Sequence, residues 1–413
     1  MIHTLSLNIQ LPYDEWEAVK AQYKPCITYR KDPKTERQYT EIRKYEKQGI
    51  VYDFRKYKSK GCSTQYLIYL RLNPSKLLGG GTLSIFSPDH AEELLTAYHD
   101  TVSDLWGESW PEFASLLTFC VRRVDYCIQL DIDPDIGVET YIRLFQHGDK
   151  PHRGKYSIQY DYNQDPIHEA YKRHKDGSVY FKGGALDIQD GKARYTRGSM
   201  IVNIYDKREE MEADNDAYQK KHGRPKYAAE VLTEAANKLR VEIQALPRKV
   251  DNLKRANTMT TKSILEYCDI DIAREIVLRM YAQICGIGDY MDKDRAKQMI
   301  ANSSKQTKTK ERMITALDII SPPNGGRPKE GWAIWKIRED METNQQQYPM
   351  SRTQFDNVLK ALASIGVNPV LVPSKSATIP SLYPRLQAYF DDLQSVVCAD
   401  IEHDSNMFDD NEG

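Results

Sequence analysis

The chain has 413 residues, a formal net charge of −1, and 40% hydrophobic and 28% charged residues, which is ordinary for a soluble globular protein of two or three domains. No apolar run reaches the roughly 18–20 residues of a membrane helix, and the start lacks the basic segment of a signal peptide. The seven cysteines include no C-x-x-C pair, which argues against a zinc ribbon and fits reduced thiols. We therefore expect a cytoplasmic protein with no membrane partner.

The charges are unevenly distributed along the chain. No Lys or Arg follows Arg385, and we expect residues 399–413 to form an acidic disordered tail. Basic runs at 55–60 and 304–312, together with 27 tyrosines against 9 phenylalanines, are typical of a surface that binds nucleic acid. The alternative for each basic run is an ordinary solvated face, and for each tyrosine an amphipathic strand residue.

Hydrophobic periodicity predicts mixed strands and helices in the first part of the chain. The expected elements are a strand at 2–9, a helix at 14–23, strands between 38 and 73, a helix at 88–106, a strand at 117–131 and a helix at 137–147.

Residues 148–200 predict short strands among turns, and two longer strands are expected at 199–206 and 238–245. A polar helix–turn–helix insertion is expected between them, at about 208–237. From about 258 onward the pattern is helical, with Ser351 as a candidate N-cap.

Three of these strands have one apolar and one polar face, because alternate residues of a strand point to opposite sides. The polar faces carry Arg123 and Asp125, then Tyr205 and Lys207, then Arg240 and Glu242. On alternation alone, an ordinary exposed face with cross-strand ion pairs is the favoured explanation of this pattern.

If the strands share a sheet, these side chains favour phosphodiester chemistry. Asp125 and Glu242 are candidate ligands of a divalent cation, which prefers oxygen atoms. Tyr205 is a candidate nucleophile, and Lys207 is placed to favour its phenolate or to bind the phosphate.

The order RVD, YDK and RVE resembles the gene II/X replication proteins of filamentous phages, which are rolling-circle initiators without a His-hydrophobe-His site, and the related Rep_trans plasmid initiators. The start MIHTLSLNIQLP, the segment LRLNPSKLLGGGT (70–82) and SRTQFDNVLKALASIGVNP (351–369) are also similar to the gene II proteins. The similarity is thin but collinear, and it covers most of the chain.

The resemblance implies a nickase that recognises a replication origin. It makes Tyr205 the nucleophile and Lys207 its catalytic partner. Asp125 and Glu242 would bind Mg²⁺ or Mn²⁺, and the remaining candidates, Arg123, Arg240 and Lys76, would bind DNA phosphates. The implied partners are origin duplex and exposed single-stranded DNA, with a host helicase and polymerase in a bacterial cell.

The wider superfamily of rolling-circle enzymes uses a His-hydrophobe-His metal site, and none of the nine histidines forms such a pair. Carboxylates would therefore carry the metal, or a lone histidine such as His152, His168 or His174 would help. The glycines after Lys76 do not match a P-loop and predict a tight strand-to-helix turn.

We therefore expect an α+β fold. Residues 1–256 would form an antiparallel-sheet catalytic region, RRM- or palm-like, with helices on one face and the site on the exposed face. Residues 257–398 would form a mainly helical region that binds DNA or a partner. The alternatives are a relaxase of a conjugative element, a sequence-specific DNA-binding initiator or repressor that does not nick, and a structural protein.

Overall fold

A computed structural model describes most of the chain. The described residues are 1–22, 27–31, 38–42, 48–57, 64–106, 114–149, 156–160, 171–173, 179–181, 186–190, 199–259, 261–321, 333–373 and 376–393. The fold is α+β, as predicted, and the strand pairings with a described register are all antiparallel. Within this part of the chain, no helix combines the length and the apolar character needed to cross a membrane.

The main sheet has ten strands in the order β2-β3-β4-β5-β1-β6-β12-β11-β10-β7, and β8 and β9 form a separate pair. The strands are β1 Ile2–Leu11, β2 Ile27–Lys31, β3 Gln38–Ile42, β4 Ile50–Tyr57, β5 Gln65–Leu72, β6 Cys120–Asp131, β7 Tyr156–Tyr160, β8 Tyr171–Arg173, β9 Val179–Phe181, β10 Leu186–Asp190, β11 Met200–Asp206 and β12 Lys238–Ala245.

The chain forms two compact units, and each is described by itself. Unit 1 comprises Met1–Ile128, Lys192–Ile201 and Glu242–Ala273. Unit 2 comprises Gln129–Gly191, Val202–Val241 and Arg274–Gly413. The division into a catalytic region that ends at residue 256 and a DNA- or partner-binding region that ends at residue 398 stays a prediction.

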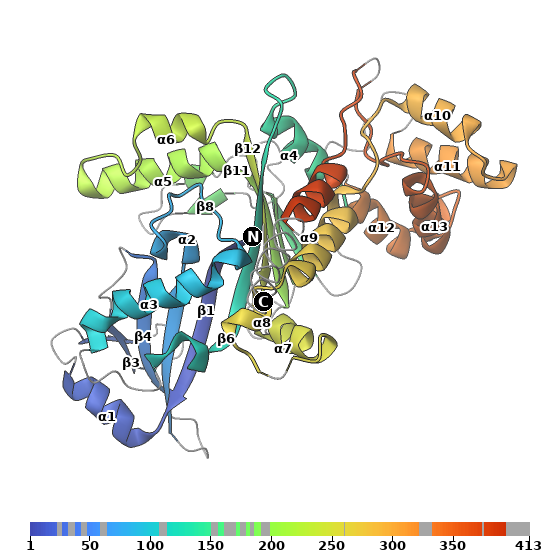
Figure 1. Cartoon of the computed structure of the whole chain (residues 1–413). Helices are drawn as coiled ribbons and strands as arrows, with labels where there is room; N and C mark the ends of the chain where they lie inside the picture. Colours follow the sequence, from blue (N-terminus) through green and yellow to red (C-terminus); the bar gives the residue numbers. More distant parts are fainter. Residues whose placement is uncertain are drawn as a thin grey trace, which may run out of the picture. The chain divides into compact units, whose positions relative to one another are not determined.

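Unit 1 is built on the central strand β1, which pairs with β5 on one side and with β6 on the other. Helical segments accompany this sheet in unit 1, and the α-helices among them are labelled in Figure 1. They are α1 Tyr13–Gln22, α2 Pro74–Leu77, η3 Pro88–His90, α3 Ala91–Trp106, η5 Leu116–Thr118, α7 Pro247–Ala256 and α8 Ile264–Tyr267.

Two contacts, one between aromatic rings and one between tyrosine hydroxyls, join helices to the sheet of unit 1. The ring of Trp16 in α1 lies 5.4 Å from that of Tyr66 in β5. The Tyr98 hydroxyl of α3 lies 2.5 Å from the Tyr52 hydroxyl of β4 and donates to the carbonyl of Ala114. The hydroxyls of Tyr52 and Tyr98 are thus hydrogen-bonded, which avoids the cost of an unpaired hydroxyl in the core.

Unit 2 contains the helices between β6 and β12 and most of those that follow β12. They are α4 Val138–Gln146, α5 Lys207–His222, α6 Ala229–Glu234, α9 Ile270–Cys285 (which begins in unit 1), α10 Lys293–Asn302, α11 Thr307–Ile320, α12 Ile334–Thr343, η6 Gln345–Gln347, α13 Arg352–Ala363 and a helix at 383–393. The polar insertion folds as α5 and α6, joined by a turn, and the helical character of the later chain is confirmed.

Ser351 is the N-cap of α13, as predicted, and it forms a capping box with Gln354. The Ser351 hydroxyl accepts from the backbone N–H of Gln354 at 3.3 Å, and the Gln354 side chain accepts from the N–H of Ser351 at 2.9 Å. These two bonds satisfy backbone donors that the helix itself leaves unpaired.

We expect Ser351→Ala to lower the free energy of unfolding by about 1 kcal/mol, because the cap is lost. Urea unfolding followed by circular dichroism measures this difference. Ser351→Asp, which keeps a side-chain acceptor, is the matched control and should unfold near the wild-type midpoint. Equal destabilisation by both variants would show that the cap does not stabilise α13.

The segment that contains Lys76 is the tight turn that was predicted. The Asn73 side chain caps α2 by accepting from the backbone N–H of Lys76 at 3.0 Å, and Gly79 adopts a left-handed φ of +78°. A Cβ at Gly80 would lie 2.7 Å from the carbonyl oxygen of Ser75, so the turn requires glycine there. Lys76 itself is exposed.

Several sequence predictions fall outside the described residues. These are the roles of His152, His168 and His174 and the acidic tail at 399–413.

Candidate metal centre

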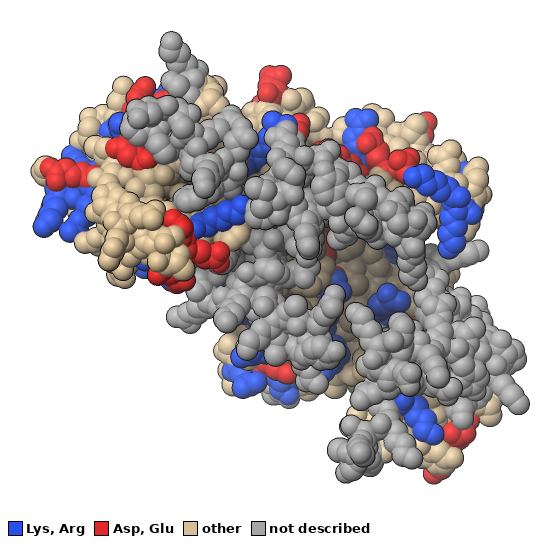
Figure 2. All heavy atoms as spheres, turned by 180° about the vertical axis from the view of Figure 1, so that it is seen from behind, with Lys and Arg blue, Asp and Glu red and all other residues tan. Residues whose placement is uncertain are grey.

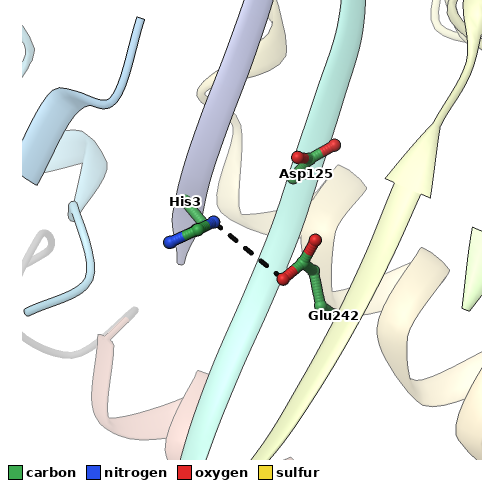
Figure 3. A group of neighbouring side chains, drawn as sticks. All are labelled: His3, Asp125 and Glu242. Carbon is green, nitrogen blue, oxygen red and sulfur yellow. Dashed lines mark ion pairs between the residues drawn. The ribbon is translucent and has the colours of Figure 1, made fainter. Parts of the chain in front are cut away.

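Three side chains of unit 1 converge at one point of the sheet: His3, Asp125 and Glu242. They come from β1, β6 and β12, which are consecutive strands, and Figure 3 shows them turned toward one another. One nitrogen or oxygen atom of each lies within 4.8 Å of the others. The two carboxylates predicted from sequence alternation are therefore brought together, and a histidine joins them. We call these three residues the triad.

His3 reaches the triad through an irregularity in the pairing of β1 with β6. Ile2 is opposite Tyr126 and Thr4 is opposite Asp125, so His3 is an extra residue between two successive pairs. Such a bulge bends the strand and redirects the side chain. Under strict alternation His3 would share the face of Leu5 and Leu7, which are fully buried in the core. Sequence periodicity consequently missed it.

Asp125 is held by Arg123, two residues earlier on the same face of β6. The Arg123 Nε donates to Oδ1 at 2.6 Å, and Nη2 donates to Oδ2 at 2.7 Å. This two-point pair fixes the plane of the carboxylate. One lone pair on each oxygen remains able to bind a cation, because a carboxylate oxygen accepts at two positions.

Glu242 is oriented by a neighbour on its own strand. The Gln244 side-chain amide donates to Glu242 Oε1 at 2.9 Å, and the His3 Nδ1 lies 3.9 Å from Oε2. Thr4 Oγ1 lies 3.2 Å from the same imidazole nitrogen. The hydrogen bond leaves Oε2 directed toward His3, as Figure 3 shows.

The two carboxylates of the triad are buried and the histidine is partly exposed, which contradicts the expectation of an exposed polar face. The side chain of Asp125 is 1% exposed, that of Glu242 is 8% exposed, and that of His3 is 27% exposed. Burial raises the pKa of Asp125 to about 7; the hydrogen bond and charge of Arg123 oppose this increase, and the charge of Glu242 adds to it. The site therefore holds a carboxyl group that is costly to ionise without an additional cation.

The donor set fits a divalent cation. When both carboxylates of the triad are ionised and the imidazole of His3 is neutral, the triad and Arg123 together carry one net negative charge. Bound oxygen and nitrogen ligands lie about 2.1 Å from Mg²⁺ or Mn²⁺, so any two lie no more than about 4.2 Å apart. The present separations of up to 4.8 Å need only a small inward shift of the side chains.

Without a metal, the free energy of unfolding is expected to fall as the pH rises from about 4 to about 7. In this window the folded protein keeps a proton on Asp125 that the unfolded chain releases, because the pKa of Asp125 is raised by burial. The loss is up to about 4 kcal/mol, since each pKa unit corresponds to about 1.4 kcal/mol.

Urea titrations in EDTA at several pH values test this prediction. Asp125→Asn should flatten the dependence, while Asp131→Asn, an exposed carboxylate at the end of β6, should leave it unchanged. Identical profiles for wild type and Asp125→Asn would show that Asp125 does not titrate in this range.

The predicted nucleophile Tyr205 lies in β11, in unit 2. Its strand alternates as expected: Val202 and Ile204 are buried, whereas Asn203 and Tyr205 are partly exposed.

Lys207 does not extend this strand, which corrects the prediction. β11 ends at Asp206, whose carboxylate caps α5 by accepting from the backbone N–H groups of Arg208 and Glu209. Lys207 is the first residue of that helix, and its buried ammonium group lies 2.6 Å from Glu210 Oε2. An Asp that precedes several good helix formers is a strong N-cap signal, which alternation ignored.

The remaining predicted residues occupy different environments. Arg240 is fully buried and donates from Nη2 to the side chain of Gln129 at 2.8 Å. Contact of Arg240 with a DNA phosphate would require it to become exposed. Arg123 is one-third exposed beside Asp125, and Lys76 is exposed at α2. Phosphate binding by these three residues stays a prediction.

Comparison with known proteins gave no match to a family model, to a curated protein or to a solved structure.

Proposed function

We propose that the protein is a rolling-circle DNA replication initiator, related to the gene II/X proteins and the Rep_trans initiators, that nicks DNA and rejoins it. The observation that carries the proposal is the triad. The RVD and RVE motifs are far apart in the sequence, and their buried carboxylates, Asp125 and Glu242, lie beside the partly exposed His3. Two carboxylates and an imidazole supply the oxygen and nitrogen ligands that a divalent cation takes, and a bound cation would offset the cost of ionising the buried Asp125.

The triad would hold Mg²⁺ or Mn²⁺, and the imidazole favours Mn²⁺ because nitrogen ligands suit transition metals better than Mg²⁺. A bound cation would neutralise charge on the phosphate during transfer. Arg123 would keep the plane of Asp125 fixed toward the cation, and Gln244 would do the same for Glu242.

Tyr205 would act as the nucleophile in a transesterification. Its Oη forms a bond to the phosphorus, the bond from phosphorus to the 3′-oxygen breaks, and that oxygen takes up a proton while the phenol loses one. The products are a 5′-phosphotyrosyl link and a 3′-OH that primes a polymerase. The reverse reaction reseals the strand without an energy source.

The proposal requires Tyr205 to reach a phosphate bound at the triad. Support comes from each unit by itself: unit 1 contains the triad, and unit 2 contains Tyr205 on the partly exposed face of β11.

The test is to isolate the covalent intermediate. The protein is incubated with Mn²⁺ and the supercoiled DNA of the replicon that encodes it, then digested with nuclease and protease. We expect mass spectrometry to find a nucleotide on Tyr205, joined through a 5′-phosphate. A nucleotide on another residue would overturn the assignment of Tyr205. Binding without an adduct in either Mg²⁺ or Mn²⁺ would indicate a DNA-binding initiator or repressor instead.

A further inference from the structure

A strongly basic surface lies in unit 1 and includes none of the triad residues. It consists of α7 and the residues beside it, and we call it the α7 surface: Arg122, Arg248, Lys249, Lys254, Arg255 and Lys262. Between residues 247 and 267, the acidic residues are Asp251 and Glu266. Figure 2 shows Lys and Arg side chains gathered about a small acidic patch in the region of α7.

The positive charges of the α7 surface act together. The Lys262 ammonium group is paired with Asp251, and it is the main reason that the pKa of Asp251 is lowered; Arg122 and Arg255 lower it further. Three cations from different elements thus surround one carboxylate. Because this carboxylate neutralises only one of them, the surface keeps a local excess of positive charge.

The α7 surface rests on a rigid base. Val250 and Leu253 bury the apolar face of α7, which leaves Arg248 and Arg255 exposed on the outside. The backbone N–H of Val121 at the start of β6 donates to the carbonyl of Lys262 at 2.9 Å. Cations held on packed elements bind at a smaller entropic cost than those on loose loops.

The α7 surface and the triad lie on opposite faces of the sheet. The Tyr126 hydroxyl donates to the carbonyl of Tyr267 at 3.2 Å, and the Tyr267 hydroxyl donates to the carbonyl of Val250 in α7 at 3.1 Å. α7 therefore packs on the Tyr126 face of β6, whereas the neighbouring Asp125 points to the other face. Groups on the Tyr126 face do not contact a phosphate that is bound at the triad.

We propose that the α7 surface binds the phosphate backbone of duplex DNA beside the strand that is cut. The inference rests on the proposed function only in taking DNA as the ligand. Dispersed Lys and Arg side chains match the regular phosphates of a duplex, and such contacts give affinity without sequence preference. The α7 surface would keep the protein bound to the duplex while the triad, on the other face of the sheet, binds the single strand that is cut.

The experiment measures binding to a fluorescent duplex of about 30 base pairs by anisotropy in EDTA, over a range of salt concentrations. The double variant Arg248→Gln and Arg255→Gln should bind about tenfold more weakly near 0.1 M salt, and its log–log salt slope should fall by about 1.8. Lys220→Gln with Lys221→Gln is the matched control. Both lysines are exposed near the end of the acid-rich α5, and this pair should bind like wild type.

A second measurement uses the wild-type protein alone, so it does not depend on the folding of a variant. Arginine modification by a dicarbonyl reagent, mapped by mass spectrometry, should be slower at Arg248 and Arg255 when the duplex is present. Unchanged modification, or equal weakening of binding by both pairs of substitutions, would overturn the α7 surface as the duplex site. A wild-type protein that binds no DNA at all would overturn the proposed function as well.

Discussion

Replacing Tyr205 by phenylalanine is expected to eliminate the covalent protein–DNA adduct and to lower nicking by about a thousandfold or more, because the attacking oxygen is removed. The change deletes one atom from a partly exposed side chain that follows the buried Ile204, so the fold should persist. Denaturing gels of end-labelled DNA measure the adduct, and relaxation of supercoiled DNA with Mn²⁺ measures nicking.

Tyr227→Phe is the matched control for this experiment. Tyr227 lies between α5 and α6 and donates its hydroxyl to Asp214 Oδ2 at 2.6 Å. It should nick at the wild-type rate, which would show that loss of a tyrosine hydroxyl in unit 2 is not harmful in itself. If Tyr205→Phe still forms the adduct, another residue is the nucleophile and the match of β11 to the YDK motif is wrong.

Replacing Glu242 by glutamine is expected to weaken Mn²⁺ binding by about a hundredfold or more and to eliminate metal-dependent nicking. The variant loses the charge that attracts the cation and keeps nearly the same shape. Isothermal titration calorimetry with Mn²⁺ alone measures the affinity without relying on activity. His3→Ala should weaken Mn²⁺ more than Mg²⁺, because it removes the only nitrogen ligand of the triad.

Glu266→Gln is the matched control for Glu242→Gln, because it also replaces a carboxylate of unit 1 by an amide. Glu266 accepts from the backbone N–H of Thr261 at 3.2 and 3.3 Å and does not belong to the triad. Its variant should bind Mn²⁺ like wild type. DNA binding in EDTA should survive Glu242→Gln, because it uses other residues. Wild-type Mn²⁺ affinity in Glu242→Gln would mean that the triad is a structural ion-pair cluster.

Much of the fold could be predicted from periodicity because its strands are long and regular. β12 has the expected bounds of 238–245, and β11 differs from its expected range by one residue. The apolar positions of both strands are buried as alternation requires. Asp125 and Glu242 could be paired from sequence for the same reason: each is flanked by apolar residues that point to the core.

The rest of the site could not be predicted, because it depends on departures from regularity. His3 joins the triad through an extra residue in β1, and an insertion in a strand pairing is not visible without the partner strand. Burial of Asp125, Glu242 and Arg240 depends on what covers the sheet, which alternation within single strands does not encode. Lys207 was misplaced because a helix begins immediately after β11.

The triad draws its ligands from positions 3, 125 and 242, which are more than a hundred residues apart along the chain. A cation bound there would act as a cross-link that closes two long loops, and it would gain affinity only after β1, β6 and β12 have paired. During synthesis, a nascent chain that already contains Tyr205 but not β12 has only part of the cluster. For the proposed nickase, catalytic competence would thus arise late, when the central strands are complete.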